Sequence, residues 1–411
     1  MERLQKIRKL LRKHSQEHLL MKYDELDKVG KKQLLDLIET IDFDLMERLY
    51  QKATTPVIEE NSTIEPISYI DKDTLAEGDA AFYKEIGKTA IKYGKVAAVT
   101  MAGGQGTRLG FNGPKGAFVF YPEKNKSIFE ALADTMNGAC RKYNVEIPWY
   151  IMTSRANNEE TIKFFEAHNY FGYPEGKIKF FIQGELPMMD FNGKILLDEK
   201  GFPKMAANGH GGTLFSMEKT GVLEEMKRDG IWYISVNGVD NILTKPIDPL
   251  FIGLMICKRV LGAVKTIYKT NPDEKVGVMC RKNGKVGVVE YTEISKQMAN
   301  LRNEDGKLVF GDAYALFNLY TIEGLEKIAE VSLPYHIAVK KANYIDSKGN
   351  TIIAEGPNAY KFEMFLFDSY EEFDDVVILR VRRDEEFAPI KNAAGNDSPE
   401  TALEMYKKFE K

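Results

Sequence analysis

The 411-residue sequence has only three cysteines, no long apolar run and no excess of basic charge. The cysteines lie far apart, at Cys140, Cys257 and Cys280, and form neither a CxxC pair nor the spacing of a metal finger. This spacing is typical of free thiols in a reducing compartment. No segment approaches the about 18 uninterrupted apolar residues of a membrane helix, and the charged N-terminal segment lacks the apolar core of a secretory signal. We therefore expect a cytoplasmic protein with no membrane partner.

The charge balance argues against a nucleic-acid partner. The chain carries 57 lysines and arginines against 61 aspartates and glutamates, a formal net charge of −4. Nucleic-acid binders need a basic surplus to neutralise phosphates, although a local basic pocket for a small anion is compatible with this balance. With 44% hydrophobic and 29% charged residues, the composition is that of an ordinary globular chain. The length suggests about two or three domains.

The first fifty or so residues are predicted to be helical. An apolar stripe from Leu4 to Leu19 has helical spacing, and apolar positions within 34–41 and 45–49 predict two further helices. Residues 52–80 have weaker periodicity, and we expect them to connect the helical region to the rest of the chain.

The remainder of the chain has the pattern of an α/β protein. Helical patterns at 127–143 and 157–168 lie between short apolar runs that predict strands over 95–101, 149–154, 177–183, 231–236, 262–268 and 376–381. This alternation favours a largely parallel, doubly wound sheet whose strands are covered on both faces. Residues 276–294 differ and predict an antiparallel hairpin turned by Asn283-Gly284. The chain is expected to end in a short helix.

A glycine-rich loop follows the first predicted strand. Residues 101–118 read MAGGQGTRLGFNGPKGAF. Glycines let backbone amides approach an anion closely, and Arg108 and Lys115 add cationic donors. The combination predicts a cradle for a triphosphate, the alternative being an ordinary glycine-rich turn.

Two common phosphate-binding patterns do not fit this loop. A P-loop needs Gly-Lys followed by Ser or Thr, whereas Lys115 is followed here by Gly and Ala. A dinucleotide-binding GxGxxG would need glycine in place of Leu109 and a helix directly afterwards, but a Gly-Pro pair follows. We therefore expect a long loop that lies over its ligand.

Further motifs accompany the loop along the chain. GGQGTRLG and PKG occur together with HSQEHLL near the N-terminus, WYIMTS (149–154), QGELP (183–187), NGHGG (208–212), VDNIL (239–243), DPLFIG (248–253), KTNPDEKVGV (269–278), VVEYTEIS (288–295) and FAPIKN (387–392). In order and spacing, nearly the whole chain resembles the UDP-sugar pyrophosphorylases, and among them the eukaryotic-type UDP-N-acetylhexosamine pyrophosphorylases.

The resemblance implies a fold and a domain plan. The expected fold is α/β, with a Rossmann-like nucleotidyltransferase core in which helices flank a mostly parallel mixed sheet. We expect a helical N-terminal region at 1–80 and a catalytic domain at 81–325. A small α+β C-terminal region at 326–411 is expected to contribute phosphate-binding lysines.

The resemblance also implies a reaction between UTP and a sugar 1-phosphate that yields a UDP-sugar and pyrophosphate. The sugar phosphate oxygen attacks the α-phosphorus of UTP in line with the departing pyrophosphate, without a covalent enzyme intermediate. Catalysis then depends on positioning and charge neutralisation. The sequence agrees, because it offers donors, cations and a carboxylate but no GxSxG or HExxH motif. The implied cofactor is Mg²⁺, and the protein is expected to be a monomer or a weak homo-oligomer.

The resemblance assigns roles to residues of this sequence. The implied nucleotide-binding residues, the last two at the uracil edge, are Gly103, Gly104, Gly106, Thr107, Gln183 and Gly209. The implied catalytic cations, which act on the phosphates, are Arg108, Lys115 and Lys391. Asp240 is the implied metal ligand, since it follows a predicted strand and carboxylates suit Mg²⁺. The implied sugar-phosphate-binding residues are His210, Glu290, Tyr314 and Lys361.

Two positions depart from the family pattern on the sugar side. His210 stands where the family usually has Asn, and Tyr314 stands where a sugar-contacting Asn is expected. The nucleotide motifs are intact, so we expect UTP as nucleotide and an altered or relaxed sugar preference. N-acetylglucosamine 1-phosphate is the first expected sugar, and glucose or galactose 1-phosphate is the alternative.

Two other classes of function are weighed against this one. A non-catalytic UDP-sugar-binding protein would be expected to lose Arg108, Lys115 or Asp240, yet all three are present. A nucleotidyltransferase acting on nucleic acid is disfavoured by the acidic net charge.

Overall fold

The structure is a computed structural model that describes residues 2–55, 62–346 and 348–409. The chain forms two compact units, each made of three segments. Unit 1 comprises Met1–Glu60, Gly184–Gly212 and Leu333–Phe365, and unit 2 comprises Asn61–Gln183, Thr213–Ser332 and Leu366–Lys411. The division into functional domains stays a prediction, because compactness alone does not assign function to a segment.

Unit 1 combines three helices with short antiparallel strands. The helices are α1 (Glu2–Lys13), α2 (Lys28–Glu39) and α3 (Phe43–Thr54). The strands are β8 (Glu185–Pro187) with β10 (Met205–Ala207), β17 (Tyr344–Ile345) with β18 (Thr351–Ile352), and the sheet β16 (His336–Lys340), β19 (Ala359–Glu363) and β9 (Met189–Asp190). Apolar side chains of the helices and strands share one core. The three predicted helices are confirmed, except that the first does not extend to Leu19.

The first helix ends early because of the backbone at Ser15. This residue has φ +54°, a left-handed conformation that α-helices do not continue through. Leu19 is nevertheless buried, because it lies on a separate short turn that packs into the same core. The spacing therefore predicted the burial of Leu19 correctly and its secondary structure wrongly.

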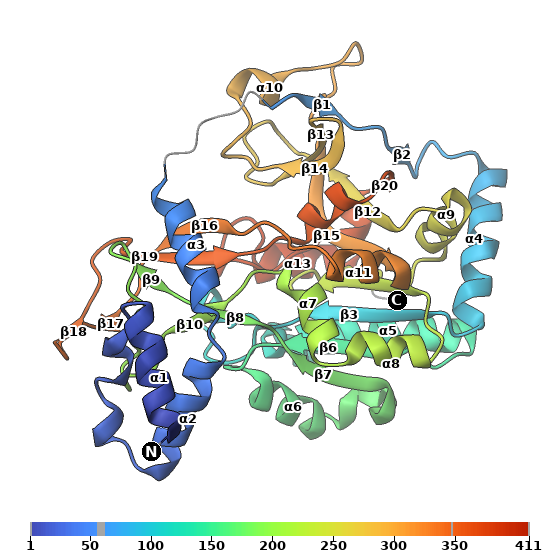
Figure 1. Cartoon of the computed structure of the whole chain (residues 1–411). Helices are drawn as coiled ribbons and strands as arrows, with labels where there is room; N and C mark the ends of the chain where they lie inside the picture. The colour runs from blue at the N-terminus through green and yellow to red at the C-terminus, as the bar shows by residue number, and fades with distance from the viewer. Residues whose placement is uncertain (1, 56–61, 347, 410–411) are drawn as a thin grey trace. The chain divides into compact units, whose positions relative to one another are not determined.

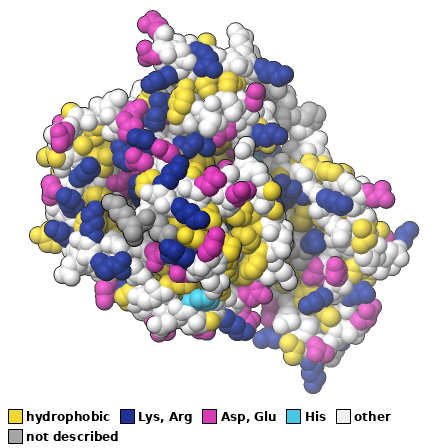
Figure 2. All heavy atoms as spheres, turned by 180° about the vertical axis from the view of Figure 1, so that it is seen from behind, with side chains coloured by type: hydrophobic (Ala, Val, Ile, Leu, Met, Phe, Trp, Pro, Cys, Tyr) yellow, Lys and Arg dark blue, Asp and Glu magenta, His cyan; other side chains and the backbone are white. Residues whose placement is uncertain are grey.

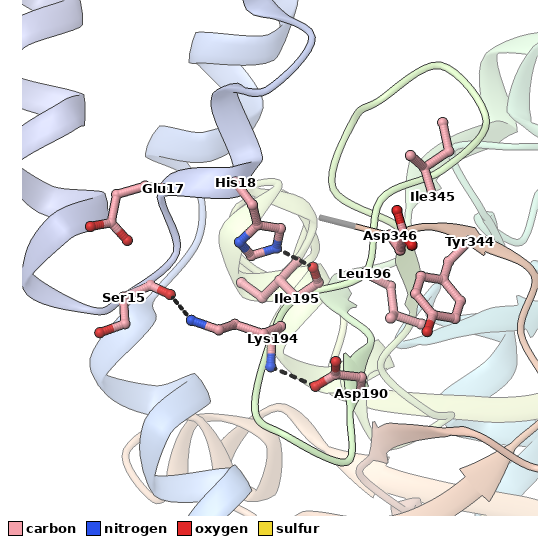
Figure 3. Close-up of a pocket in the computed structure, with 10 residues that line it drawn as sticks. All are labelled: Ser15, Glu17, His18, Asp190, Lys194, Ile195, Leu196, Tyr344, Ile345 and Asp346. Atoms are coloured by element: carbon pink, nitrogen blue, oxygen red, sulfur yellow. Dashed lines mark hydrogen bonds between the residues drawn. The ribbon is translucent and has the colours of Figure 1, made fainter. Parts of the chain in front are cut away.

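The HSQEHLL segment ties the end of α1 to the loop after β9 (Figure 3). Nε2 of His18 lies 2.8 Å from the carbonyl oxygen of Ile195, and the Lys194 ammonium donates to the Ser15 carbonyl. The buried Gln16 side chain accepts from the Ile195 backbone N–H at 3.0 Å. Burial lowers the pKa of His18, so its ring is neutral at pH 7. These contacts give the motif a structural role within unit 1, around a cavity of about 380 Å³.

Unit 2 is built on a mostly parallel sheet with strand order β2-β20-β12-β15-β11-β3-β6-β7 (Figure 1). Neighbouring strands run parallel except for β15, which is antiparallel to β11 and β12. The strands are β2 (Ile70–Asp71), β3 (Val96–Met101), β6 (Trp149–Thr153), β7 (Ile178–Ile182), β11 (Tyr233–Gly238), β12 (Gly262–Tyr268), β15 (Asp312–Thr321) and β20 (Val376–Val381). The six predicted strands are confirmed. The strand β15 is not among the predicted strands, because the buried Asp312 and Asn318 interrupt its apolar pattern.

The helices outside unit 1's three are α4 (Glu77–Lys92), α5 (Ile128–Tyr143), α6 (Asn158–Ala167), α7 (Gly212–Lys219), α8 (Val222–Arg228), α9 (Pro249–Lys258), α10 (Lys296–Asn300), α11 (Ile322–Ala329), α12 (Arg383–Glu386) and α13 (Pro399–Lys407). Apolar residues of α4, α5, α6, α9 and α13 share a large core with the sheet, whereas α10 packs with the segment 278–289. The helices predicted at 127–143, 157–168 and the C-terminal end correspond to α5, α6 and α13. Figure 1 shows α4 and α9 side by side, and their backbones approach closely at Gly87 and Gly253. A Cβ at Gly87 would lie 1.9 Å from the Pro249 carbonyl oxygen, so this packing requires glycine.

The predicted hairpin is present beside the main sheet. It consists of β13 (Val278–Lys282) and β14 (Lys285–Val289), and its turn residues Asn283 and Gly284 have φ +52° and +81°. Two positive φ values suit a tight hairpin turn. Two further short pairings are β1 (Ile64–Pro66) on β13, and β4 (Val119–Tyr121) on β5 (Lys126–Ser127). The predicted connection at 52–80 thus contains β1, β2 and the start of α4, while its residues 56–61 lie outside the described residues.

The surface carries charges of both signs. On the face drawn in Figure 2, lysine and arginine side chains are interspersed with aspartate and glutamate side chains. Across the residues that the structure describes, no helix is both long enough and apolar enough to cross a bilayer. The three cysteines are free thiols, as expected.

Candidate active site

The glycine-rich loop runs from the end of β3 to α5 and folds back on itself. The Gly106 N–H donates to the Gly113 carbonyl at 3.0 Å, and the Lys115 N–H donates to the Gly104 carbonyl at 3.0 Å. The long helix α5 begins only at Ile128. The expectation of a long loop with no helix directly after it is therefore confirmed.

A buried asparagine anchors this loop to the neighbouring strand. Asn157, just before α6, donates to the carbonyl oxygens of Ala102 and Gly104 at 2.9 and 3.2 Å, and accepts from the Ser154 N–H at 2.8 Å. The side chain is completely buried. The sequence analysis did not single out Asn157. Its position, three residues after Ser154 at the carboxyl end of a predicted strand, was the available indication.

Gln183 lies against the first glycine of the loop. It directly follows β7, and its N–H donates to the Thr153 carbonyl at 2.7 Å. A Cβ added to Gly103 would lie only 2.6 Å from Oε1 of Gln183. The structure therefore brings together two of the predicted nucleotide-binding residues, at the carboxyl ends of β3 and β7.

This contact makes Gly103→Ala a specific probe of the loop. The added methyl group would displace the Gln183 amide, so we expect UTP affinity to fall by about tenfold, or about 1.4 kcal/mol, on the usual affinity scale. Calorimetric titration with UTP would measure it. Gly138→Ala is a suitable control, because a Cβ at this position of α5 meets nothing within 4 Å. Equal UTP affinity in both variants would contradict the prediction.

The VDN and FAPIKN motifs are joined at the end of β11. Asn241 accepts from the Ala388 N–H at 2.8 Å, and the Asp240 carbonyl accepts from the Ile390 N–H at 2.9 Å. These bonds bring Lys391, the next residue of FAPIKN, beside Asp240. Two motifs about 150 residues apart along the sequence thus belong to one place in unit 2.

Four predicted residues share one electrostatic environment at this place. Burial lowers the pKa of Lys115, the carboxylate of Asp240 acts to raise it, and the charges of Lys391 and Arg108 lower it further. Three cations and two carboxylates, Asp240 and Asp397, thus act on one another here, and Asp397 lies 3.8 Å from the Lys391 ammonium. A surplus of cations beside a glycine-rich loop is suited to a polyphosphate.

Glu290 and Tyr314, two of the predicted sugar residues, both lie beside Gly277. The Tyr314 N–H donates to the Gly277 carbonyl at 2.9 Å, and a Cβ at Gly277 would lie 3.4 Å from Oε1 of Glu290. The Tyr314 hydroxyl donates to Asn318 at 2.7 Å, and its ring packs edge-on against Phe367. Burial raises the pKa of Tyr314 well above its ordinary value, so the hydroxyl stays protonated. The structure thus gives Tyr314 a buried internal contact, and its role toward the sugar stays a prediction.

Gly209 and Lys361 lie in unit 1. Gly209 has φ +85°, and a Cβ there would lie 2.3 Å from the Met364 carbonyl oxygen, so both conformation and space require glycine. The Lys361 ammonium lies 2.7 Å from a carboxylate oxygen of Glu363. Their predicted roles toward uracil and phosphate stay predictions.

His210, the third predicted residue in unit 1, belongs to an aromatic stack. Its ring lies 5.1 Å from the ring of Phe365, which also stacks with His336 at 4.5 Å. Burial, followed by the charge of His336, lowers the pKa of His210 to about 4. The ring is therefore neutral at pH 7, where it can donate or accept a hydrogen bond but carries no charge.

The fold and the loop together define the class of protein. A mostly parallel α/β sheet, with a glycine-rich and cation-bearing loop at the carboxyl end of β3, is the framework of a nucleotide-binding enzyme. More specifically, the chain belongs to the UTP–glucose-1-phosphate uridylyltransferase family, whose family model matches residues 43–397. It is therefore an enzyme of the nucleotidyltransferase class, a uridylyltransferase.

Individual relatives cover most of the chain. It is 35% identical over 401 residues to UDP-N-acetylhexosamine pyrophosphorylase-like protein 1 of Xenopus tropicalis, covering 92% of this chain and 78% of that protein. It is 34% identical over 414 residues to UDP-N-acetylglucosamine diphosphorylase 2 of Arabidopsis thaliana, covering 95% and 81%. A crystal structure of the uridine diphosphate N-acetylglucosamine pyrophosphorylase of Trypanosoma brucei, with an inhibitor, superposes with a TM-score of 0.84 at 30% identity, covering 98% and 84%. The predicted family and fold class are confirmed.

Proposed function

We propose that the protein transfers the uridylyl group of UTP to N-acetylglucosamine 1-phosphate, releasing pyrophosphate and UDP-N-acetylglucosamine. The observation that carries this proposal is that the charges of Arg108, Lys391 and Asp240 all act on Lys115 in the glycine-rich loop, while the Ile390 N–H binds the Asp240 carbonyl. The names of the relatives in Arabidopsis and Trypanosoma support the choice of N-acetylglucosamine, and the name of the Xenopus relative supports an N-acetylhexosamine.

In this proposal the protein supplies position and charge. A phosphate oxygen of the sugar 1-phosphate forms a bond to the α-phosphorus of UTP, while the bond to the bridging oxygen breaks and pyrophosphate leaves with the electron pair. Arg108 and Lys115 neutralise charge on the UTP phosphates, and Lys391 neutralises the incoming phosphate. The amides of Gly103, Gly104, Gly106 and Thr107 hold the nucleotide. Burial disfavours the charged form of Lys115, whereas a bound phosphate would favour it.

Asp240 would hold the metal ion. Its carboxylate is half-buried, and no hydrogen bond or ion pair from the described residues engages it. Among the described residues, the only group of three metal-ligating side chains is His14, Asp44 and Glu47, so Asp240 belongs to no such group. A lone carboxylate fits Mg²⁺, which commonly takes its other ligands from phosphates and water. When bound, the ion would neutralise phosphate charge.

The other predicted residues complete the proposal. Gln183 and Gly209 would read the uracil edge, since a side-chain amide and backbone groups can match its N–H and carbonyls. Glu290, Tyr314, His210 and Lys361 would contact the sugar phosphate. The cytoplasmic location and the monomeric or weakly oligomeric state also stay predictions, the first supported by the free thiols.

A panel of sugar 1-phosphates tests the proposed substrate. Pyrophosphate release with UTP and Mg²⁺ would be compared for the 1-phosphates of N-acetylglucosamine, N-acetylgalactosamine, glucose and galactose. We expect the highest kcat/KM with N-acetylglucosamine 1-phosphate and measurable turnover with others, because His210 and Tyr314 depart from the family pattern. A sharp preference for N-acetylglucosamine 1-phosphate would remove the relaxed-preference hypothesis, and a preference for glucose 1-phosphate would overturn the proposed sugar.

Arg108→Lys tests the catalytic role of the guanidinium group. The exchange keeps the charge but replaces a planar fork by a point charge, so we expect kcat/KM to fall by about ten- to a hundredfold. Arg141→Lys, on the exposed side of α5, provides the matched control. Steady-state pyrophosphate release measures both variants. Equal kcat/KM for the two would exclude bidentate phosphate binding by Arg108.

A further inference from the structure

A second basic site lies in unit 2, apart from the cluster around Asp240. It is a cavity of about 540 Å³ bounded by the end of β2, by α4 and α5, and by the segment that leads into α9. Its lining contains the lysines Lys72, Lys84, Lys88, Lys142 and Lys245. None of these is a predicted catalytic, nucleotide-binding or sugar-binding residue. A cavity of this volume falls within the range typical of small-ligand sites.

The two carboxylates of the lining do not neutralise these lysines. Asp248 and Glu386 both bind the buried ammonium of Lys265, at 2.7 and 2.6 Å. Glu386 is also 3.0 Å from the Lys72 ammonium and 3.6 Å from that of Lys245. Glu385 also lies 3.2 Å from the Lys72 ammonium, so three carboxylates balance Lys72, Lys245 and Lys265, and any positive surplus of the cavity comes from its other lysines.

Lys84 and Lys142 carry the least compensated charges. Lys84 lies on α4 and Lys142 in the last turn of α5, and neither has a carboxylate partner among the described residues. Lys142 lies over the ring of Tyr143, with 5.5 Å between its ammonium and the ring centroid. Lys88 is paired with Glu85, on the same helix. An uncompensated group of cations is notable in a chain whose net charge is −4.

The cavity also offers a hydroxyl donor and a rigid wall. Tyr143 is buried in the lining, and burial raises its pKa, so its hydroxyl stays protonated at neutral pH. Pro246, Ile247 and Leu250 supply an apolar wall. Lys84, Lys142 and Lys245 are exposed, so what the cavity offers an anion is ammonium groups that reach it from three different segments, α4, α5 and the segment before α9.

We propose that this lysine-lined cavity binds a polyphosphate anion, with inorganic pyrophosphate as the simplest example. The anion would be held by the ammonium groups of Lys84, Lys142 and Lys245 and by the Tyr143 hydroxyl. The same chemistry could be presented by free pyrophosphate or by the phosphates of a nucleotide. The backbone carbonyl of Glu386 accepts from the Asn241 side chain at 2.7 Å, and Asn241 adjoins Asp240. The Glu386 part of the lining is thus hydrogen-bonded to the segment that carries the proposed metal ligand.

Lysine footprinting on the full chain tests the proposal residue by residue. An amine-acylating reagent would be applied at constant ionic strength, with and without metal-free pyrophosphate, and labelled peptides quantified by mass spectrometry. At about ten times the Kd, roughly nine in ten sites are occupied, so acylation of Lys84, Lys142 and Lys245 should slow about tenfold. Lys92, exposed on α4 outside the cavity, is the internal control and should not change. Equal rates with and without pyrophosphate, or equal slowing at Lys92, would overturn the proposal.

A parallel arm with UTP distinguishes the two sources of phosphate. Protection of the three cavity lysines by pyrophosphate alone assigns the site to the free anion, and protection by both assigns it to polyphosphates in general. Protection by UTP but not by pyrophosphate would overturn the assignment to a simple anion site. Because the footprint requires no turnover, its result does not depend on whether the proposed function is correct.

Paired variants provide a second measurement. In an Arg108→Gln background, which weakens the proposed catalytic site, residual pyrophosphate binding should fall at least about tenfold when Lys84→Gln and Lys142→Gln are added. Lys92→Gln with Lys163→Gln removes two exposed helix lysines and is the charge-matched control. Unchanged residual binding in the cavity variant would contradict the site, and circular dichroism would verify that both variants are folded.

Discussion

Replacing Asp240 by Asn is expected to reduce kcat by about two to three orders of magnitude, while UTP binding without metal stays nearly unchanged. The amide keeps the shape of the carboxylate but lacks the negative charge that a divalent cation requires. The carboxylate has no competing partner among the described residues, so loss of its charge would act mainly on the metal. Steady-state turnover at increasing Mg²⁺, together with calorimetric UTP titration, measures the two effects separately.

Asp397→Asn is the matched control for this experiment. Asp397 belongs to the same environment and lies 3.8 Å from the Lys391 ammonium, but it is not the proposed metal ligand. We expect Asp397→Asn to change turnover far less and to leave the Mg²⁺ dependence unaltered. If the Asp240 variant kept normal Mg²⁺-dependent turnover, Asp240 would have no metal role.

Replacing Glu386 by Gln is expected to cost about 3–5 kcal/mol of unfolding free energy, because it breaks a buried ion pair and leaves the buried Lys265 with Asp248 as its one carboxylate partner. Glu386 is completely buried and lies 2.6 Å from the buried ammonium of Lys265. Chemical denaturation monitored by circular dichroism measures the loss. Glu385→Gln is the control: its carboxylate lies 3.2 Å from Lys72 but is partly exposed, so we expect less than about 1 kcal/mol. Equal losses in both variants would contradict this account of the buried cluster.

The same residue predicts a pH dependence of stability. Burial alone would raise the pKa of Glu386, but the ammonium groups of Lys265, Lys245 and Lys72 outweigh it and hold the pKa well below its ordinary value of 4.5, at about 2. The carboxylate therefore takes up its proton at lower pH in the folded state than in the unfolded state. Its stabilising contribution is complete above about pH 4.5 and is lost as the pH falls toward 2. Glu386→Gln should flatten the stability curve in this window, and an unaltered slope would contradict the shift.

The sheet could be predicted from the sequence because its signals are local. The strands of unit 2 that were predicted are short apolar runs. The glycine-rich loop was recognisable because its glycines themselves indicate the backbone conformation. The strand β15 was missed because its buried polar residues Asp312 and Asn318 have partners elsewhere, namely Arg380 and Tyr370. Only the tertiary structure shows that these polar groups are satisfied, so their burial could not be inferred from the pattern.

The site was predictable as a set of residues but not as a geometry. The family motifs identified Asp240 and Lys391. The bonds that join their two segments, such as the one that the Ala388 N–H donates to Asn241, depend on long-range packing. Asn157 supports the loop with two side-chain bonds yet belongs to no motif quoted for the resemblance. The two units likewise combine distant segments, which local periodicity cannot pair.

The most direct test of the central claim is product analysis with the full chain. UTP, N-acetylglucosamine 1-phosphate and Mg²⁺ would be supplied together, and UDP-sugar and pyrophosphate would be quantified by chromatography and an enzyme-coupled assay. The account predicts equal amounts of UDP-N-acetylglucosamine and pyrophosphate, with neither formed when the sugar phosphate is omitted. UTP breakdown without a UDP-sugar, or no product with UTP still bound, would contradict it.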